Sequence, residues 1–501
     1  MMLLSQAAKA TGGTLVPFAG IQGGDVRING VSSDSRKIVQ GDLFVALRGE
    51  HFDGYNFAAT AAQAGAVAAM VNADSYQERL TGRKEQKAVP APGIPLLLVE
   101  DTRVALGRLA AWWRRQFDIP VVAITGSNGK TTVKEMLAGI LRAAADSADA
   151  VLATIGNLNN DIGMPLTLLH MNATHRYAVI EMGMNHPGEI DYLTRIAAPD
   201  VALINNASGA HLEGLGTVEA VARAKGEIFS GLQPHGTAVI NSDDEYARLW
   251  RALAGAHPLL EFGLNSEADV SGTWHPHGYG LRLDVTAPQG MFAADLHVPG
   301  MHNARNALAA TAAATVLNIP LETIAAGLEK FSGVPGRMQR KAALHDASLI
   351  DDTYNANPAS MRAAINVLAQ AAGKRILVLG DMGELGGDAE ILHAEIGTEA
   401  RRAGIEKLYA LGALSGNAVR EFGNGARHFE RIEDLLAALE KELDENTTVL
   451  VKGSRFMKME RVVSHLVDTE KGEGKREKGG EITGSSPSPF PLSPSQKGGG
   501  H

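Results

Sequence analysis

Residues 125–132, Thr-Gly-Ser-Asn-Gly-Lys-Thr-Thr, are of the types that bind the phosphates of a nucleotide. The apolar run Val121–Thr125 precedes them and the alanine- and leucine-rich stretch Val133–Ala145 follows, so a buried strand, a loop and a helix are expected. Glycines let the backbone turn tightly beside an anion, the helix N-terminus offers free N–H groups, and a lysine adds positive charge. Ile124 stands where the usual phosphate loop has its first glycine. The predicted nucleotide-binding residues are Gly126, Ser127, Asn128, Gly129, Lys130, Thr131 and Thr132.

Two oxygen-bearing side chains near this loop are candidates for a magnesium site. Thr131 is placed to offer its hydroxyl to Mg²⁺ bridging two phosphates. Glu181 ends the apolar run Ala178–Met182, and ligands bind at the carboxyl ends of parallel strands. A carboxylate is a hard oxygen ligand, so the pattern indicates ATP with Mg²⁺.

The elements that position these residues alternate between strand and helix up to about residue 468. Short apolar runs separated by helical stretches favour an α/β fold with parallel sheets covered on both faces. The predicted strands are Asp42–Leu47, Val121–Thr125, Ala178–Met182, Val201–Asn205, Ala238–Asn241, Leu349–Asp352, Ile376–Gly380, Leu408–Leu411 and Thr448–Lys452. Helices are expected over Leu106–Phe117, Val133–Ala145 and Pro358–Ala372.

A chain of 501 residues is long enough for about three domains. Breaks in the pattern near residues 105–118 and at Ser332–Pro335 suggest domains over 1–110, 111–333 and 334–468. The remaining 469–501 is rich in Gly, Ser, Pro and charge, with little to bury, and is expected to be disordered.

Composition excludes several classes of protein. A net charge of -9 argues against a broad basic face for nucleic acid. The 0 cysteines exclude disulfides, thiol nucleophiles and cysteine-bound zinc, and fit a reducing compartment. No apolar run approaches the roughly 20 residues of a membrane span, and the N-terminus does not resemble a signal peptide. We expect a cytoplasmic protein, acting as a monomer.

The loop Thr-Gly-Ser-Asn-Gly-Lys-Thr-Thr resembles that of the Mur ligases and folylpolyglutamate synthases, and the resemblance to the Mur ligases extends over roughly residues 25–465. It implies three domains: a small N-terminal domain for a uridine nucleotide, a central ATPase domain and a C-terminal Rossmann-like domain. It supports Glu181 as a metal ligand and implies that His211 helps to hold a second metal ion. It also implies that Lys225, in the helical stretch 220–229, is carbamylated and so becomes a metal ligand.

The same resemblance assigns the remaining nucleotide contacts. Asn303, near the start of an alanine-rich helix, would bind the adenine, although it could also simply cap that helix. Arg337, near the interdomain hinge, would contact the γ-phosphate, where a permanently charged guanidinium suits an anionic transition state. Asp352 would bind the ribose, and Tyr354 would lie near the adenine.

Four runs narrow the resemblance to a family member that joins D-alanyl-D-alanine to UDP-N-acetylmuramoyl-tripeptide. They are Val31–Arg36 with Gly41–Phe44, Gly156–Gly163, Leu379–Leu385 and Lys452–Met457. The D-N-P-R motif of the ligase that adds the preceding amino acid is absent. The implied substrate-binding residues are Ser33, Asp34, Ser35, Arg36, Thr154, Asn157, Asn159 and Asn160.

The resemblance implies that the tripeptide carboxylate is phosphorylated by ATP and that the dipeptide amine then attacks the acyl phosphate. The residues leave the general base open between His186, His211 and a substrate phosphate. A folylpolyglutamate synthase, a small-molecule kinase and a non-catalytic nucleotide-binding scaffold are alternatives. A pteroate substrate would indicate the synthase, and ATP consumption without amide formation would indicate the kinase. Tight ATP binding without turnover would indicate the scaffold.

Overall fold

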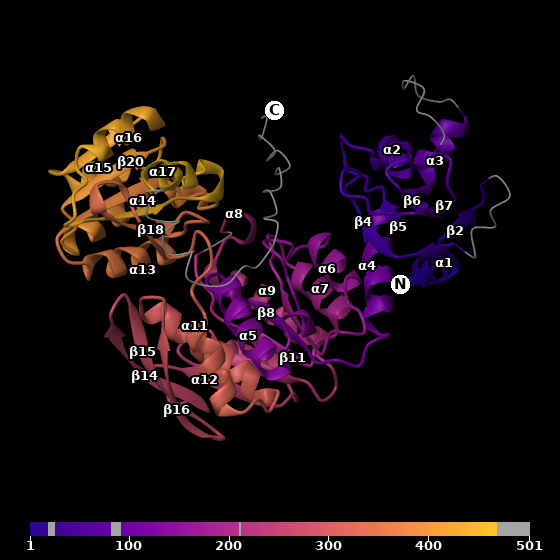
Figure 1. Cartoon of the computed structure of the whole chain (residues 1–501), viewed down its shortest axis with the longest axis horizontal. Coiled ribbons are helices and arrows are strands. Elements are labelled where there is room, and N and C mark those ends of the chain that lie inside the picture. Colours follow the sequence, from indigo (N-terminus) through magenta and orange to yellow (C-terminus); the bar gives the residue numbers. More distant parts are fainter. Residues whose placement is uncertain (19–25, 82–91, 210–211, 468–501) are drawn as a thin grey trace.

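A computed structural model describes residues 1–18, 26–81, 92–209 and 212–467 of the chain. Its main elements form three sheets, and the N-terminal and C-terminal sheets lie on opposite sides of the central part (Figure 1). The predictions for His211 and for the tail 469–501 fall outside the described residues.

The N-terminal sheet has five strands in the order β2-β7-β6-β5-β4. All neighbours are parallel except β2 and β7. Leu43 and Val45 of β5 pack toward the central part, whereas Phe44 packs on the opposite face. Its elements, with the small β1–β3 pair, are β1 (Met2–Leu3), α1 (Leu4–Thr11), β2 (Thr14–Val16), β3 (Arg27–Ile28), β4 (Gly30–Ser32), β5 (Asp42–Val45), η2 (Gly54–Phe57), α2 (Ala58–Gln63), β6 (Ala68–Asn72), α3 (Ala73–Leu80) and β7 (Leu96–Val99).

The central sheet has nine strands in the order β16-β15-β14-β13-β12-β11-β8-β10-β9. Its first elements are α4 (Thr102–Arg114), β8 (Val121–Thr125), α5 (Lys130–Ala145), η3 (Ala148–Ala150), β9 (Val151–Ala153), α6 (Gly163–Leu169), β10 (Tyr177–Glu181), α7 (Glu189–Ala197) and β11 (Val201–Ile204). They are followed by α8 (Leu212–Leu215), α9 (Val218–Gly226), η4 (Glu227–Gly231), β12 (Thr237–Asn241), α10 (Ala247–Ala254), β13 (Leu259–Gly263), β14 (Val270–His277), β15 (Gly280–Ala287), β16 (Gly290–Leu296), α11 (Met301–Val316) and α12 (Leu321–Glu329).

Side chains of β8 show how this sheet is covered on both faces. Val121 and Ala123 pack into one hydrophobic core, and Val122 and Ile124 pack into the other, because successive side chains of a strand point to opposite faces. Each core is closed by helices, so the strand is apolar throughout, as expected for a buried parallel strand.

The C-terminal sheet has six strands in the order β17-β18-β22-β19-β20-β21, parallel except for β17. Its strands β18, β22 and β19 are neighbours, so the loops that follow them emerge side by side. The elements are β17 (Gln339–Ala342), η5 (Leu344–Asp346), β18 (Ser348–Asp352), α13 (Pro358–Ala369), β19 (Lys374–Gly380), η6 (Gly386–Asp388), α14 (Ala389–Arg402), β20 (Lys407–Leu411), α15 (Gly416–Phe422), β21 (Ala426–Phe429), α16 (Ile432–Glu440), β22 (Thr447–Lys452), η7 (Arg455–Met457) and α17 (Glu460–Leu466).

The predicted α/β class is confirmed, but the sheets are mixed rather than purely parallel. Strands β14, β15 and β16 form an antiparallel meander that the sequence reading did not identify. Gly278, at φ 60, makes the tight turn between β14 and β15. Helix α13 ends three residues before the predicted Ala372, and α4 begins at Thr102, where the Asp101 carboxylate caps it.

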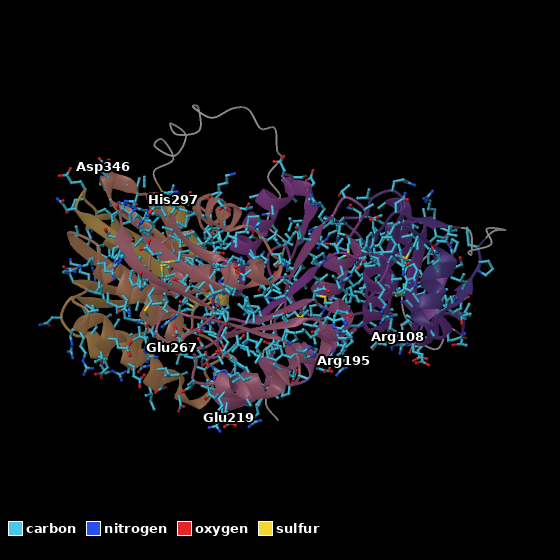
Figure 2. The ribbon with its side chains drawn as sticks, turned by 90° about the horizontal axis from the view of Figure 1, so that it is seen from below. Arg108, Arg195, Glu219, Glu267, His297 and Asp346 are labelled. Atoms are coloured by element: carbon cyan, nitrogen blue, oxygen red, sulfur yellow. The ribbon has the colours of Figure 1, made fainter. Side chains whose placement is uncertain are left out.

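Charged side chains on the outer surface include Arg195 of α7 and Glu219 of α9, labelled in Figure 2. Arg195 pairs with Asp191 one helical turn earlier, at 2.8 Å. An exposed pair of this kind contributes only about 0.3–0.5 kcal/mol. In the part of the chain that the structure describes, no helix is long and apolar enough to cross a membrane.

Candidate active site

The phosphate loop joins the end of β8 to the first turn of α5. Gly129 has φ 79, and a Cβ there would clash with the side chains of Asn205 and Asn306, so glycine is required. Lys130 lies at the helix start, and its ammonium donates to the Gly126 carbonyl over 2.6 Å. Burial lowers the pKa of Lys130, and the carboxylate of Glu181 opposes that effect. The loop thus brings a positive charge and the N-terminus of a helix to one place.

A network of hydrogen bonds surrounds Glu181 at the end of β10. The Thr131 hydroxyl donates to Glu181 Oε2 over 2.9 Å, and Asn159 Nδ2 donates to Oε1 over 2.8 Å. The backbone N–H of Glu181 donates to the Thr154 hydroxyl over 2.9 Å. Arg337 Nη2 donates to the Thr131 hydroxyl over 3.0 Å, which brings the hinge arginine onto the phosphate loop. The carboxylate is therefore held in a fixed orientation.

The oxygen atoms of Thr131 and Glu181 fit a magnesium ion that is held jointly with nucleotide phosphates. Mg²⁺ takes oxygen ligands and usually keeps several waters, so one or two protein ligands are sufficient. No cluster of three or more His, Asp or Glu side chains suited to a metal occurs among the residues that the structure describes. The Thr131 and Glu181 oxygens fit a magnesium ion whose other ligands are nucleotide phosphates and water.

Lys225 of α9 is buried, with 2% of its surface exposed. Burial, followed by repulsion from Lys130, lowers the pKa of its ammonium well below the usual value. A lowered pKa increases the uncharged fraction of a lysine at a given pH, and the uncharged amine is the nucleophilic form. Lys225 is not among the residues that line the cavity described below.

Asparagines connect the phosphate loop to the neighbouring strand end and to α11. The side-chain amides of Asn205 and Asn206 each donate to the Asn128 carbonyl over 3.0 Å. Asn205 also donates to Asn306 over 2.9 Å, and Asn306 donates to Asn303 over 3.2 Å. Asn303, predicted to bind adenine, is buried, and its amide donates to the Pro299 carbonyl. The sequence reading did not identify Asn205 and Asn206 as functional, although their place at a strand end was a usable signal.

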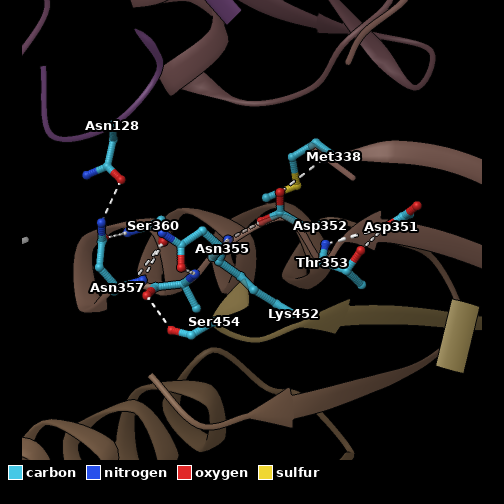
Figure 3. A network of polar contacts seen from close by, with 11 residues as sticks. Asn128, Met338, Asp351, Asp352, Thr353, Asn355, Asn357, Ser360, Lys452 and Ser454 are labelled. Carbon is cyan, nitrogen blue, oxygen red and sulfur yellow. Dashed lines mark hydrogen bonds and ion pairs between the residues drawn. The ribbon is translucent and has the colours of Figure 1, made fainter. Parts of the chain in front are cut away.

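On the C-terminal side, Asp352 lies at the end of β18 and is held by two groups. Lys452 Nζ donates to its carboxylate over 2.5 Å, and the N–H of Met338 donates over 3.1 Å (Figure 3). Burial raises the pKa of Asp352, and the Lys452 ammonium opposes the rise. This predicted ribose ligand is therefore part of a buried ion pair, whose lysine the sequence reading did not assign to the site.

A second hydrogen bond, beside that from Arg337 to Thr131, joins the C-terminal part to the phosphate loop. Asn357 Nδ2 donates to Asn128 Oδ1 over 2.8 Å, and the same Asn357 caps α13 by accepting from the Ser360 N–H (Figure 3). Arg337 lies over the ring of Tyr354, 4.1 Å from its centroid. These contacts bring the predicted residues Asn128, Arg337 and Tyr354 to one place.

A cavity of about 2390 Å³ lies between the central and C-terminal sheets. Most of the predicted site residues line it: Ser127, Asn128, Gly129, Lys130, Thr131, Thr132, Asn157, Asn159, Asn160, Glu181, Asn303, Arg337, Asp352 and Tyr354. Gly126 and Thr154 lie behind its wall, where they support Lys130 and Glu181. His186, considered as a general base, is exposed and outside the cavity wall.

The segment Ser33–Arg36 lies after β4, away from this cavity. The Arg36 guanidinium donates two hydrogen bonds to Asp34, each 2.8 Å long. That pairing lowers the pKa of Asp34. The predicted uridine-nucleotide residues therefore form a separate, solvent-accessible group on the N-terminal sheet.

Three family models match the chain, one to each sheet. They are the "Mur ligase family, catalytic domain" over residues 27–114, the "Mur ligase middle domain" over 124–314 and the "Mur ligase, glutamate ligase domain" over 336–455. Together they cover most of the 501 residues.

Similar proteins match over nearly their whole length. The UDP-N-acetylmuramoyl-tripeptide–D-alanyl-D-alanine ligase of Escherichia coli K12 is 41% identical over 450 residues, which is 89% of this chain and 95% of that protein. A crystal structure of MurF from Acinetobacter baumannii has a TM-score of 0.82 and 36% identity, covering 92% of this chain and 97% of the other. The MurF ligase of Thermotoga maritima in complex with ADP has a TM-score of 0.75 and 27% identity, over 90% and 99%.

Proposed function

This chain belongs to the Mur ligase family, and from that premise we propose that it joins D-alanyl-D-alanine to UDP-N-acetylmuramoyl-tripeptide with consumption of ATP. The observation that carries the proposal is the cavity in which the phosphate loop of the central sheet faces the strand ends of the C-terminal sheet. One wall suits a triphosphate, and the other supplies a second set of polar groups for an acceptor. The product would be the UDP-linked pentapeptide, with ADP and phosphate.

The chemistry has two steps. The terminal carboxylate of the tripeptide attacks the γ-phosphorus of ATP, the bond to the bridging oxygen breaks, and ADP leaves. The uncharged amine of D-alanyl-D-alanine then attacks the acyl carbon, loses a proton and displaces phosphate. Fixed positive charges stabilise the negative charge that spreads over the phosphoryl group in the first step.

Lys130 and Arg337 are proposed to supply those charges. Lys130 begins α5, and Arg337 reaches the same loop from the hinge, where its contact with Thr131 measures 3.0 Å. The ring of Tyr354, 4.1 Å away, also restricts where the Arg337 guanidinium can lie. Thr131 and Glu181 would hold Mg²⁺, which when bound neutralises phosphate charge.

Asn303, Asp352 and Tyr354 line the cavity, and this position supports the proposal that they contact the nucleotide. Asn303 is proposed for adenine, with Tyr354 close to it, and Asp352 for ribose. Adenine recognition would require Asn303 to exchange its hydrogen bonds to Pro299 and Asn306 for the base. Ribose recognition could leave the Lys452 pair intact, since a carboxylate accepts several hydrogen bonds.

The UDP-linked substrate is proposed to bind over two regions, with Ser33–Arg36 at its nucleotide end and the segment 154–160 nearer its peptide. This separation suits a long substrate, because binding energy from a remote group can be used to orient the reacting end. We propose that the chain has three domains, residues 1–110, 111–333 and 334–468, and that the active site lies between the second and the third. We further propose that one chain suffices and that it acts in the cytoplasm, where ATP and the UDP-linked precursor would be available.

The test is phosphate release with ATP, Mg²⁺ and the UDP-linked tripeptide, with and without D-alanyl-D-alanine. Dipeptide-dependent ADP and phosphate, with a pentapeptide product by mass, is the expected result. Phosphate release that is independent of the dipeptide would contradict the proposal. Omission of Mg²⁺ with excess chelator should abolish turnover and thereby tests the magnesium requirement.

Lys225 is proposed to act as a carbamate, formed when its uncharged amine adds to carbon dioxide. Burial and the lowered pKa of its ammonium support this addition. Lys225→Ala should lose activity by about 10²-fold or more, and short carboxylates such as acetate should partly restore it. Unchanged activity, or loss without any restoration, would argue against the carbamate.

A further inference from the structure

Lys134 of α5 is a buried charged side chain that has no role so far. Its exposed fraction is 1%, and it ranks with Lys225 among the largest fully buried side chains of the residues that the structure describes. It is not among the residues that line the cavity, so it is not placed to touch a nucleotide or a substrate. Removing an ammonium group from water is costly, so its burial requires contacts that offset the lost hydration.

Two oxygen atoms contact the Lys134 ammonium. Its Nζ donates to the Thr154 carbonyl over 2.5 Å, and a carboxylate oxygen of Glu135 lies 2.6 Å away. Glu135 is 34% exposed and also lies 4.0 Å from Arg142, so water reaches this ion pair. An ion pair that water reaches contributes little to stability. The contact that requires a lysine at this buried position is therefore the hydrogen bond to Thr154.

Thr154 lies at the edge of the central sheet. It directly follows β9, a strand of three residues that ends the sheet beside β10. The Thr154 N–H donates to the Val179 carbonyl of β10 over 3.1 Å, whereas its own carbonyl accepts from Lys134. An edge strand has a neighbouring strand on one side only, so a contact from a helix adds to what holds it. Lys134 thus fixes the point at which the chain leaves β9.

The position of Thr154 bears on Glu181, the carboxylate proposed to hold Mg²⁺. The Thr154 hydroxyl accepts from the Glu181 N–H over 2.9 Å. The chain then continues to Asn159, whose amide donates to Glu181 Oε1 over 2.8 Å and whose carbonyl accepts from the Gly183 N–H over 2.9 Å. Thr154 therefore holds the backbone of Glu181 and begins the segment that orients its carboxylate.

Helix α5 contacts the same carboxylate from its other oxygen. The Thr131 hydroxyl donates to Glu181 Oε2 over 2.9 Å. Thr131 lies three residues before Lys134, and side chains at this spacing lie on the same face of a helix. This helix packs against both β9 and β10. One face of α5 thus reaches Glu181 directly through Thr131 and indirectly through Lys134 and Thr154.

We propose that Lys134 is a positioning residue for the Glu181 carboxylate and that it acts through Thr154. This inference rests on the proposed function, in which Thr131 and Glu181 hold Mg²⁺ together with the nucleotide phosphates. Groups that orient a metal ligand change metal affinity although they do not touch the metal. By holding Thr154, Lys134 keeps the Glu181 carboxylate at the Thr131 hydroxyl.

The first test measures how much Mg²⁺ strengthens nucleotide binding in the absence of turnover. Calorimetric titration of the full-length protein with adenylyl imidodiphosphate, in Mg²⁺ and in excess chelator, gives the ratio of the two dissociation constants. Lys134→Met should reduce this Mg²⁺-dependent gain in affinity by about 10-fold or more. A substitution that merely loosened the fold would weaken binding in both conditions and leave the ratio unchanged. An unchanged ratio in Lys134→Met would overturn the proposal.

Glu135 provides a matched control, because it contacts the same ammonium from the partly exposed side. Glu135→Gln removes the charge of the ion pair and leaves the hydrogen bond from Lys134 to Thr154 in place. The ratio of dissociation constants should therefore keep its wild-type value. A loss as large as that in Lys134→Met would assign the effect to the ion pair and exclude the path through Thr154.

The second test examines the step from Thr154 to Glu181. Thr154→Val keeps the carbonyl that accepts from Lys134 and removes the hydroxyl that accepts from the Glu181 N–H. It should reduce the Mg²⁺-dependent gain by a similar factor, and the double variant with Lys134→Met should be little worse than either single variant, because both act on one path. An unchanged gain in Thr154→Val, or losses that multiply in the double variant, would contradict that path.

Folding of each variant is established by circular dichroism. If Lys134→Met does not fold, Lys134→Gln takes its place, since glutamine keeps a polar group in the buried position but has a shorter reach. The same loss of the Mg²⁺-dependent gain is expected, and its absence would overturn the proposal equally.

The outcomes separate this inference from the proposed function. If the wild-type protein binds the analogue equally well with and without Mg²⁺, the proposed metal role of Thr131 and Glu181 fails, and the role of Lys134 fails with it. If Mg²⁺ strengthens binding in the wild-type protein and equally in Lys134→Met and Thr154→Val, only the positioning role of Lys134 fails.

Discussion

The two sheets that face the cavity present their strand ends in different ways. The end of β8 in the central sheet continues into one loop, residues 125–132, and residues 127–132 of that loop all line the cavity. The C-terminal sheet supplies residues from three separate strand ends, after β18, β19 and β22, joined by Lys452–Asp352 and Ser454–Gly383 contacts. A phosphate site can be encoded by contiguous residues, whereas the polar groups of the C-terminal sheet are brought together from distant parts of the chain.

Removal of charge from the continuous loop should have the largest effect. Lys130→Ala should lower kcat by about 10³-fold, or roughly 4 kcal/mol of transition-state stabilisation, since Lys130 supplies fixed positive charge at the phosphate loop. The measurement is ADP release, with circular dichroism to establish folding. Lys330→Ala, which replaces an exposed lysine at the end of α12, should leave the rate of ADP release unchanged. Equal rates of ADP release by Lys130→Ala and Lys330→Ala would contradict the role of Lys130 at the phosphate loop.

Removal of the Lys452–Asp352 ion pair, which joins two strand ends of the C-terminal sheet, should instead lower the free energy of unfolding. Lys452→Met leaves the buried Asp352 carboxylate without its cation, which costs about 3–5 kcal/mol. Denaturant unfolding of the variant measures this loss. The double variant Lys452→Met with Asp352→Asn should recover a large part of it, because no unpaired charge remains. Arg431→Ala, which breaks an exposed pair, should change stability by less than about 1 kcal/mol.

His302, at the start of α11 where the two sheets meet, should make stability depend on pH. Burial, with repulsion from Lys452 and Arg305, lowers its pKa to about 4. Because the unfolded chain binds the proton at about pH 6.5, this stabilising contribution is present above that value and is lost as the pH falls toward 4. The loss should be on the order of 2 kcal/mol, after allowance for partial access of water.

The measurement is unfolding free energy between these pH values, compared with that of His302→Gln. The variant should show a flatter pH profile in this window. His235→Gln, which replaces an exposed histidine, should follow the wild-type profile. Parallel profiles for His302→Gln and wild type would exclude His302 as the group responsible.

Asn357 caps α13 and also donates a hydrogen bond to Asn128 of the phosphate loop. Two substitutions separate these roles, and their expected effects are the smallest of those considered. Asn357→Ser keeps a cap for α13 but is too short to reach Asn128, so stability should change little while kcat/KM for ATP falls by about three- to tenfold. Asn357→Ala should lose about 1 kcal/mol of stability in addition. Identical behaviour of the two variants would show that the contact with Asn128 does not matter for ATP use.

The difference between a contiguous loop and residues brought together from distant strands explains which parts of the fold and site could be predicted from the sequence. Periodicity located β8, β10, β18, β19 and β22 within a residue or two. The loop motif after β8 gave Lys130 and the strand-end position gave Glu181, whereas Asp352 was assigned from the family resemblance. The meander of β14, β15 and β16 was not identified, because its residues alternate in burial and carry no chemical motif. Asn205, Asn206 and Lys452 were not assigned to the site, because each acts through a partner that is distant in sequence.

Some assignments depended on the family resemblance rather than on physical reasoning from the residues. Neither periodicity nor spacing distinguished Lys225 from a solvated helix lysine, yet the fold buries it near Lys130. Thr154, predicted to contact substrate, accepts a hydrogen bond from the Glu181 N–H and is not among the residues that line the cavity. The predictions for the bound ligands remain to be tested by the measurements above.

The sequence by itself determined the α/β class, the phosphate loop and the strand ends that carry polar side chains, because these follow from local periodicity and from contiguous residues. Only the tertiary structure decided which strand ends meet. It brought Arg337 onto Thr131, set Lys452 against Asp352 and joined the loops after β19 and β22 into one surface. The physical reason is that these contacts join residues far apart in the chain, and their closeness is fixed by sheet order and packing, which no local pattern specifies.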